Sequence, residues 1–160
     1  MGIKVIGIIP SREELTHFSV NYLAERLLAK VITGEGGLRN IVKTILIGAM
    51  SPSTALSIPS FHEGNKVVIT GGDRSDMILA ALETDSAGII LTGNILPSQN
   101  IISKASERNV PLLSVPLDTY QTAKQIENIE PLLTKDDTDK IALWEQLVQE
   151  YLTITEIGED

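Results

Sequence analysis

The chain of 160 residues contains no cysteine, and only 4% of its residues are aromatic. Without thiols it can form no disulfide, no thiolate zinc site and no cysteine nucleophile. The lack of disulfides is compatible with a reducing compartment, so we expect a cytoplasmic protein. The scarcity of aromatic rings leaves a core of Val, Ile, Leu and Ala, which is typical of buried parallel strands covered by helices.

Long apolar runs and an excess of positive charge are also missing. No apolar stretch approaches the roughly 18 residues that a membrane span needs, and Met1–Pro10 lacks the long apolar core of a secretory signal. Thirteen basic residues oppose twenty-one acidic ones, which gives a formal net charge of −8. A surface of this sign repels phosphate backbones, so we expect neither nucleic acid nor membrane as a partner.

Apolar runs alternate with helical patterns from Thr44 onward. Four runs each lead through a turn into a helical segment: 44–49 into 54–57, 66–70 into 75–84, 87–92 into 98–108, and 111–115 into 119–129. The strand ends lie 23, 22 and 23 residues apart, at Ile47, Thr70, Thr92 and Val115. This spacing indicates stacked β-loop-α units, whose crossovers return each strand to one sheet. We expect one α/β domain with a mostly parallel sheet and helices on both faces.

The amino-terminal segment carries a weaker pattern. The continuous apolar run Ile3–Ile9 predicts a buried strand that ends before a proline. Ser11 and Glu14 form a capping box, which predicts a helix that continues to Leu27. A short helix is also predicted around 38–43.

A last amphipathic helix is predicted near the carboxyl end. Its apolar residues recur on one stripe, at Ile141, Trp144, Val148 and Tyr151. We therefore divide the chain into an α/β domain at 1–135 and a carboxyl-terminal helix with its tail at 136–160. In this division, residues 153–160 form a frayed end. The helix belongs either to the same domain, packed on its own sheet, or to a dimer contact.

The strongest local motif is the turn after the second run. Thr70-Gly71-Gly72-Asp73-Arg74 ends a strand, permits a tight turn and leads into a helix whose first amides attract anions. Arg74 adds a guanidinium that can clamp a phosphate or a carboxylate. The same residues also fit a structural role, in which Asp73 or Ser75 caps the helix and Arg74 pairs with a nearby acid.

Two further turns occupy equivalent positions. Thr92-Gly93-Asn94 follows the next strand, and Asn94 tolerates the positive φ that a glycine would otherwise supply. Asp118 and Thr119 open the last helix of the series, where Asp118 is a natural cap. Carboxyl ends of parallel strands meet at one edge of a sheet, so the three turns form a candidate cleft. Each turn also fits a plain capped turn without a ligand.

No catalytic or metal-binding set accompanies these turns. His17 and His62 lack metal-ligand spacing, and the sequence contains no Gly-x-Ser-x-Gly elbow. The glycine turns lack the Gly-Lys-Ser/Thr ending of a nucleotide P-loop and the third glycine of a dinucleotide fingerprint. We therefore expect no metal, no cofactor and no catalytic residue.

In their combined order, these motifs resemble the DRTGG domain. The resemblance is strong over roughly 45–129, and it rests on Ile47–Ser51, Thr70–Asp76, Ile90–Gly93, Val110–Leu113 and Asp118–Tyr120. Asn94 departs from the family pattern, which usually has a second glycine there. The resemblance implies a three-layer α/β/α fold similar to the amino-terminal domain of HPr kinase. It also implies a mixed sheet, in which one strand runs antiparallel.

The resemblance also sets an expectation about function. DRTGG domains occur in the amino-terminal region of some phosphate acetyltransferases and between the CBS domains of some pyrophosphatases, in settings that imply regulation more than catalysis. This implies a non-catalytic module that binds a small anionic ligand, such as an adenine nucleotide, and forms a homodimer. The candidate ligand-binding residues are Thr70, Gly71, Gly72, Asp73, Arg74, Thr92, Gly93, Asn94, Asp118 and Thr119.

Two other functions fit the same sequence. The chain can be an accessory fragment of an acyl- or phosphoryl-transfer enzyme of the phosphate acetyltransferase type, with Arg74 holding the transferred group. It can also be a pure protein–protein interaction module, with the Trp144 helix as its docking surface.

Overall fold

The computed structural model describes residues 5–135 and 137–152, and the chain divides into two compact units. Phe18–Ile129 form the larger unit. The smaller unit combines the segment before residue 18 with the segment from Glu130 onward.

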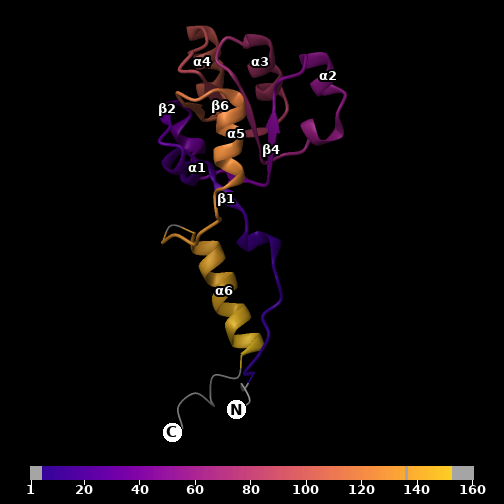
Figure 1. Cartoon of the computed structure of the whole chain (residues 1–160), viewed down its shortest axis with the longest axis vertical. Coiled ribbons are helices and arrows are strands. Elements are labelled where there is room, and N and C mark those ends of the chain that lie inside the picture. Colours follow the sequence, from indigo (N-terminus) through magenta and orange to yellow (C-terminus); the bar gives the residue numbers. More distant parts are fainter. Residues whose placement is uncertain (1–4, 136, 153–160) are drawn as a thin grey trace. The chain divides into compact units, whose positions relative to one another are not determined.

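A five-stranded sheet forms the centre of the larger unit (Figure 1). Its order is β2-β7-β6-β5-β4. The strands are β2 (Lys30–Thr33), β4 (Thr44–Ile47), β5 (Lys66–Gly71), β6 (Ser86–Thr92) and β7 (Leu112–Ser114). Strands β4 to β7 run parallel, and β2 lies antiparallel to β7. The mostly parallel sheet and its one antiparallel strand are both as expected.

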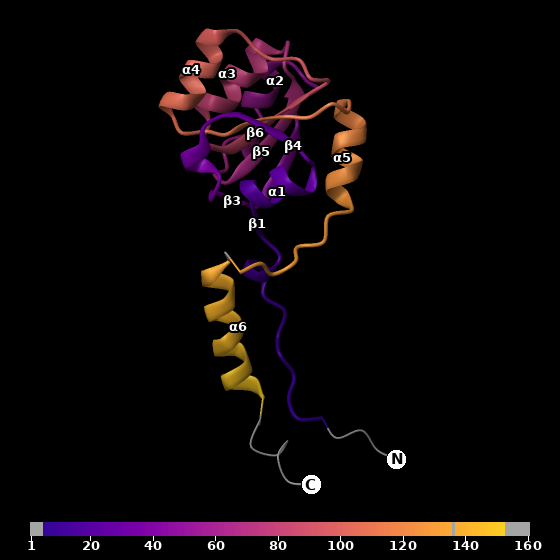
Figure 2. The same ribbon diagram turned by 90° about the vertical axis from the view of Figure 1, so that its left-hand side faces the viewer.

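Helices cover both faces of this sheet. On one face, α2 (Pro52–Leu56), α3 (Ser75–Glu83) and α4 (Gln99–Glu107) share an apolar core with the sheet. On the other face, α1 (Val20–Arg26) and α5 (Thr119–Glu127) share a second core. Figure 2 shows α5 on the opposite side of the sheet from α3 and α4. The crossovers between β4 and β7 carry their helices to one face, as crossovers of a single hand require, and the fold is a three-layer α/β/α sandwich.

One antiparallel strand pair explains two wrong predictions in the larger unit. Strand β1 (Phe18–Ser19) pairs with β3 (Ile41–Val42). The helix predicted from Ser11 therefore begins only at Val20, where Ser19 Oγ accepts a hydrogen bond from Tyr22 N–H at 3.1 Å. The helix predicted around 38–43 is absent from this described stretch, because its residues supply β3. Neither outcome is visible in local spacing, since the pairing joins segments more than twenty residues apart.

Two short 3-10 turns, η2 (Glu35–Gly37) and η3 (Pro59–Phe61), complete the larger unit.

The smaller unit holds the predicted carboxyl-terminal helix, α6 (Thr138–Tyr151), and a 3-10 turn, η1 (Glu13–Leu15). The amino-terminal strand prediction is wrong for residues 5–9, because Gly7 makes only a single bridge to Leu152. Val5 and Ile8 are 70% and 77% exposed, since no neighbouring strand covers them in the described residues.

Helix α6 buries Leu147 and leaves Trp144 44% exposed. Its docking role stays a prediction, as does the domain division at residue 135. The predicted tail at 153–160 lies outside the described residues. None of the helices in the described ranges has both the length and the apolar character that a membrane span requires.

Candidate functional site

Four loops meet at the carboxyl ends of the parallel strands, and we call them the carboxyl rim. They comprise residues 48–51 after β4, 72–74 after β5, 93–98 after β6 and 115–118 after β7. Because neighbouring parallel strands end at the same edge of the sheet, these loops lie side by side. The expected convergence of the three predicted turns on one sheet edge is therefore confirmed.

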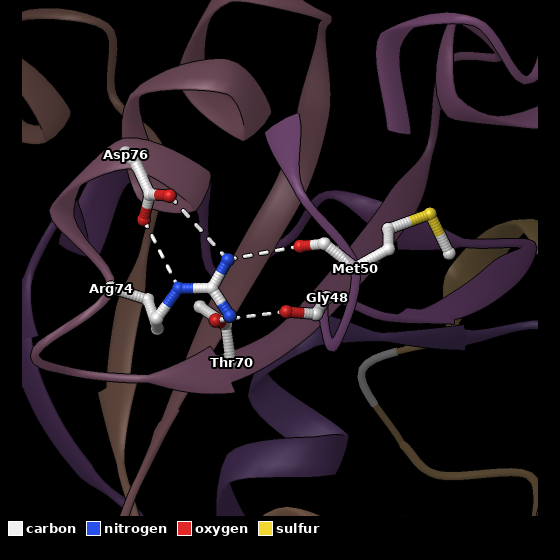
Figure 3. Close-up of polar contacts among 5 residues, drawn as sticks. All are labelled: Gly48, Met50, Thr70, Arg74 and Asp76. Carbon is white, nitrogen blue, oxygen red and sulfur yellow. Dashed lines mark hydrogen bonds and ion pairs between the residues drawn. The ribbon is translucent and has the colours of Figure 1, made fainter. Parts of the chain in front are cut away.

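Buried threonine hydroxyls link the strands below the rim. Thr70 Oγ1 donates to the carbonyl of Gly48 at 3.4 Å, and Thr92 Oγ1 donates to the carbonyl of Thr70 at 3.4 Å (Figure 3 shows the first). Each bond joins residues that are 22 positions apart, so it links one β-loop-α repeat to the repeat before it. Thr92 and Thr119 hydroxyls lie 3.1 Å apart. Since a hydroxyl has one proton and Thr92 gives it to Thr70, Thr119 is the donor in that pair.

Two residues hold the Arg74 side chain at the end of the rim that is formed by the loops after β4 and β5. Its Nε donates to Asp76 Oδ1 at 3.1 Å, and its Nη2 donates to Asp76 Oδ2 at 3.4 Å and to the Met50 carbonyl at 2.9 Å (Figure 3). The hydrogen bond from Arg74, with backbone N–H groups of Met77 and Asp76, lowers the pKa of the Asp76 carboxyl below its ordinary value. The predicted pairing of Arg74 with a nearby acid is thus confirmed.

The glycine after β5, Gly72, serves the packing of the rim. A methyl group on Gly72 would collide with the carbonyl oxygen of Ile95, so the loop after β6 requires a bare backbone here. A methyl group on Gly71, the last residue of β5, would meet the Asp73 carboxylate, which can turn aside. The cap predicted for Asp73 or Ser75 is wrong, because the cap position of α3 is Arg74 and no side chain bonds the free amides from there.

The loop after β6 is tied to the loop after β7. Gly93 and Asn94 both have left-handed backbones, with φ of 73° and 56°, so the predicted positive φ of Asn94 is confirmed. Their N–H groups donate to the carbonyls of Leu117 and Val115, each at 2.9 Å. These amides, which the sequence suggested for a ligand, are therefore used inside the fold.

The start of α5 has the cap that the sequence predicted. Asp118 Oδ1 accepts the N–H of Gln121 at 2.8 Å. The structure thus brings Thr92 and Thr119 together near the middle of the rim. The Arg74 side chain points toward the loop after β4, and in the described part of the chain its guanidinium has no hydrogen bond to another predicted site residue.

The sequence predicted an acidic partner for Arg74 without identifying it, and it gave no indication of the Met50 carbonyl. Asp76 lies in the first turn of α3, where acidic residues are favoured by the helix dipole, so its position was a usable signal. The Met50 carbonyl gave no signal, because a backbone group is not encoded by a side-chain pattern. In the described ranges, no cluster of three or more His, Asp or Glu side chains is placed to hold a metal.

A buried lysine lies at the opposite end of β5. Lys66 Nζ donates to the carbonyls of Thr84 and Glu63, and it lies 5.4 Å from the centre of the Phe61 ring. Burial lowers the pKa of the Lys66 ammonium, and Asp85 offsets part of that shift. These bonds join the end of α3 to the start of β5, far from the rim, so Lys66 holds the fold together.

The sheet, its layers and its linked loops define a three-layer α/β/α domain in which each of the strands β5, β6 and β7 pairs with the parallel strand before it. The family model of the DRTGG domain matches residues 22–129, and the chain belongs to that family. The family resemblance drawn from the sequence is therefore confirmed.

Curated relatives of this chain include two bacterial phosphate acetyltransferases. The protein from Nitratidesulfovibrio vulgaris is 29% identical over 163 residues, which cover 96% of this chain. The protein from Synechocystis sp. is 31% identical over 157 residues, which cover 90% of this chain. This chain spans only 23% and 22% of the lengths of these two relatives.

A solved structure shares the fold. It contains the CBS and DRTGG domains of the regulatory region of Clostridium perfringens pyrophosphatase, in complex with the activator diadenosine tetraphosphate. It is 20% identical to this chain with a TM-score of 0.60, and the match covers 91% of this chain and 65% of that one.

Proposed function

We propose that this chain is a non-catalytic regulatory domain that binds a small anionic ligand, an adenine nucleotide, at the carboxyl rim and forms a homodimer. The proposal that the rim binds an anion rests on Arg74. It is the one Lys or Arg among the four rim loops, so it is the only cationic side chain that these loops offer to an anion. The activator in the pyrophosphatase regulatory region is a dinucleotide, which supports this class of ligand.

The guanidinium of Arg74 is already oriented for binding. Asp76 and the Met50 carbonyl fix its plane, and the side chain is 34% exposed. A preorganised planar donor loses less entropy when it takes a phosphate in two parallel hydrogen bonds. Among the described residues, Nη1 has no hydrogen-bond acceptor, so both of its N–H groups are available to a phosphate. Asp76 competes with that phosphate.

Exposed apolar side chains on the neighbouring loops favour a ligand with a ring. Ile95 and Leu96 after β6 and Leu117 after β7 are all exposed at the rim. Strands lie about 4.8 Å apart, so the loop after β7 is about 10 Å from the loop after β5. A nucleotide can place its phosphates on Arg74 and its base against these side chains. Acetyl phosphate has no ring and offers these side chains only a methyl group.

Calorimetry and thermal unfolding with ATP, diadenosine tetraphosphate, tripolyphosphate and acetyl phosphate test the ligand half. At a concentration about 100 times Kd, a bound ligand stabilises the native state by about 2.7 kcal/mol. We expect the nucleotides to raise the melting temperature of the wild type and to have little effect on Arg74→Gln.

Arg39→Gln is the matched control, because it removes the same charge from an exposed loop beside the amino end of β7. We expect this variant to keep the nucleotide response. The absence of any shift at saturating concentrations, or an equal loss in both variants, would rule out ligand binding at Arg74.

The relatives favour a second candidate, an accessory domain of an acyl-transfer enzyme, because phosphate acetyltransferases match nearly the whole chain. In that role Arg74 would hold the transferred group, and another domain would supply the chemistry. Formation of acetyl phosphate from acetyl-CoA and phosphate is the assay. We expect no turnover by this chain alone, and turnover that Arg74→Gln abolishes would overturn the non-catalytic proposal.

A further inference from the structure

Strand β4 forms one edge of the sheet. Its outer side pairs with no other strand in the part of the chain that the structure describes. Gly48 N–H donates inward to the Ile69 carbonyl at 2.8 Å, so by alternation the backbone groups of Ile45 and Ile47 point away from β5. Its register with β5 is unbroken from Thr44 to Ile47. A regular, unpaired edge of this kind is a template for another strand.

The opposite edge of the sheet is protected. Strand β2 has an irregular register between Val31 and Thr33, and it carries the exposed Lys30. Bulges and lysines are common devices that keep foreign strands away from an edge. Strand β4 has neither device, so the two edges differ in the way expected of a sheet that accepts a partner at β4.

The segment that carries β4 is free of charge. Residues 44–62 contain no Asp, Glu, Lys or Arg, although the whole chain has 13 basic and 21 acidic residues. This segment forms β4, α2 and η3, and we call its surface the uncharged face. Ile47, Met50 and Leu56 on it are 45%, 38% and 39% exposed. Depletion of charge around exposed apolar side chains is typical of the centre of a protein interface.

A shallow pocket opens in the uncharged face beside the strand edge. It holds about 350 Å³ of empty space, including space open to solvent. Its lining is almost entirely apolar and comprises Leu46, Ile47, Gly48, Met50, Ala55, Ile58, Ser60 and Phe61. An exposed edge beside such a pocket is the arrangement that accepts an added strand, with backbone bonds for affinity and a pocket for a side chain.

We propose that the uncharged face is the interface between two copies of this chain, with their β4 strands paired antiparallel across a two-fold axis beside Leu46. Ile45 of one copy then lies opposite Ile47 of the other, and the outward backbone groups of both are paired. Two copies that each carry a net charge of −8 repel one another, whereas residues 44–62 place no charged side chain of their own against the second copy. The inference rests on the homodimer of the proposed function and names its surface.

Light scattering coupled to size exclusion, over a range of concentrations of the full chain, tests this interface. Ile47→Lys puts a charge into the face, and Ile47→Pro removes an outward N–H that makes no bond to β5. We expect each to raise the dimer Kd about tenfold or more. Leu28→Lys is the control, because Leu28 is an exposed apolar residue next to β2, at the other edge of the sheet. It leaves the Kd unchanged.

Circular dichroism separates loss of the dimer from loss of the fold, and a variant that unfolds is replaced by Leu56→Lys on α2. A wild-type dimer that dissociates in the folded β4 variants supports the proposal, as does concentration-dependent protection of the Ile45 amide from hydrogen exchange. Folded β4 variants that stay as dimeric as the wild type overturn the interface and leave the homodimer in place. A wild type that is monomeric throughout overturns the homodimer as well.

Discussion

Thr92→Val removes the hydroxyl at the centre of the rim and keeps the shape of the side chain. Thr92 is buried, donates to the Thr70 carbonyl and accepts from Thr119. A hydrogen bond contributes about 0.5–1.5 kcal/mol net, so the two bonds together are worth about 1–3 kcal/mol. We expect Thr92→Val to lower the free energy of unfolding by that amount.

A double-mutant cycle with Thr119→Val isolates the bond between the two hydroxyls. Thr119 is only half-buried, so its replacement alone is expected to cost about 0.5–1.5 kcal/mol. The double variant loses the shared bond only once. Its cost should therefore fall short of the sum of the single costs by about 0.5–1.5 kcal/mol.

Urea unfolding followed by circular dichroism measures these costs, provided that the slope of free energy against urea is the same in all four proteins. Strictly additive costs would mean that the two hydroxyls do not interact. A cost for Thr92→Val below about 0.5 kcal/mol would refute the role of the threonine bonds in stabilising the rim.

Three further predictions concern stability. Gly72→Ala forces a methyl group against the Ile95 carbonyl and is expected to destabilise the fold by about 1–3 kcal/mol in urea unfolding; an unchanged midpoint would contradict that contact. Thr122→Val removes a buried hydroxyl with no partner in the described residues, so we expect a higher unfolding midpoint, and a lower one would reveal a hidden partner. Asp76 has a lowered pKa, so its stabilising effect is complete above the ordinary carboxyl pKa and fades as pH falls through the lowered value. Wild type and Asp76→Asn should differ in melting temperature at neutral pH and converge in acid; a gap that persists to about pH 2 would contradict this.

The β-loop-α repeats could be predicted because the sequence patterns that specify them are local. Apolar runs, turn residues and caps lie within a few positions of each other, as at Ser51, whose Oγ accepts the Thr54 N–H at 3.2 Å at the start of α2. The errors arose where distant segments decide the outcome. Phe18 keeps helical spacing with its neighbours, yet pairing with Val42 makes it a strand residue.

The candidate site was predictable to a similar degree. Thr70, Thr92 and Asp118 lie at the strand ends and helix starts where the pattern put them. Their bonds were not predictable, because most of the acceptors are backbone carbonyls supplied by another loop. The amides of Gly93 and Asn94 illustrate this, since carbonyls after β7 take the donors that the sequence left free for a ligand.

Met50 belongs to two surfaces at once. Its carbonyl accepts a hydrogen bond from Arg74, and its side chain points away from the guanidinium (Figure 3). Met50 also lines the pocket of the uncharged face. In the proposed dimer, a phosphate that drew Arg74 from this carbonyl would release a loop that the second copy would hold in place. Linkage then requires that ligand and association change each other's equilibrium constants by one common factor. Nucleotide would shift the dissociation curve of the dimer, and the size of that shift would give the coupling free energy between the rim and the uncharged face.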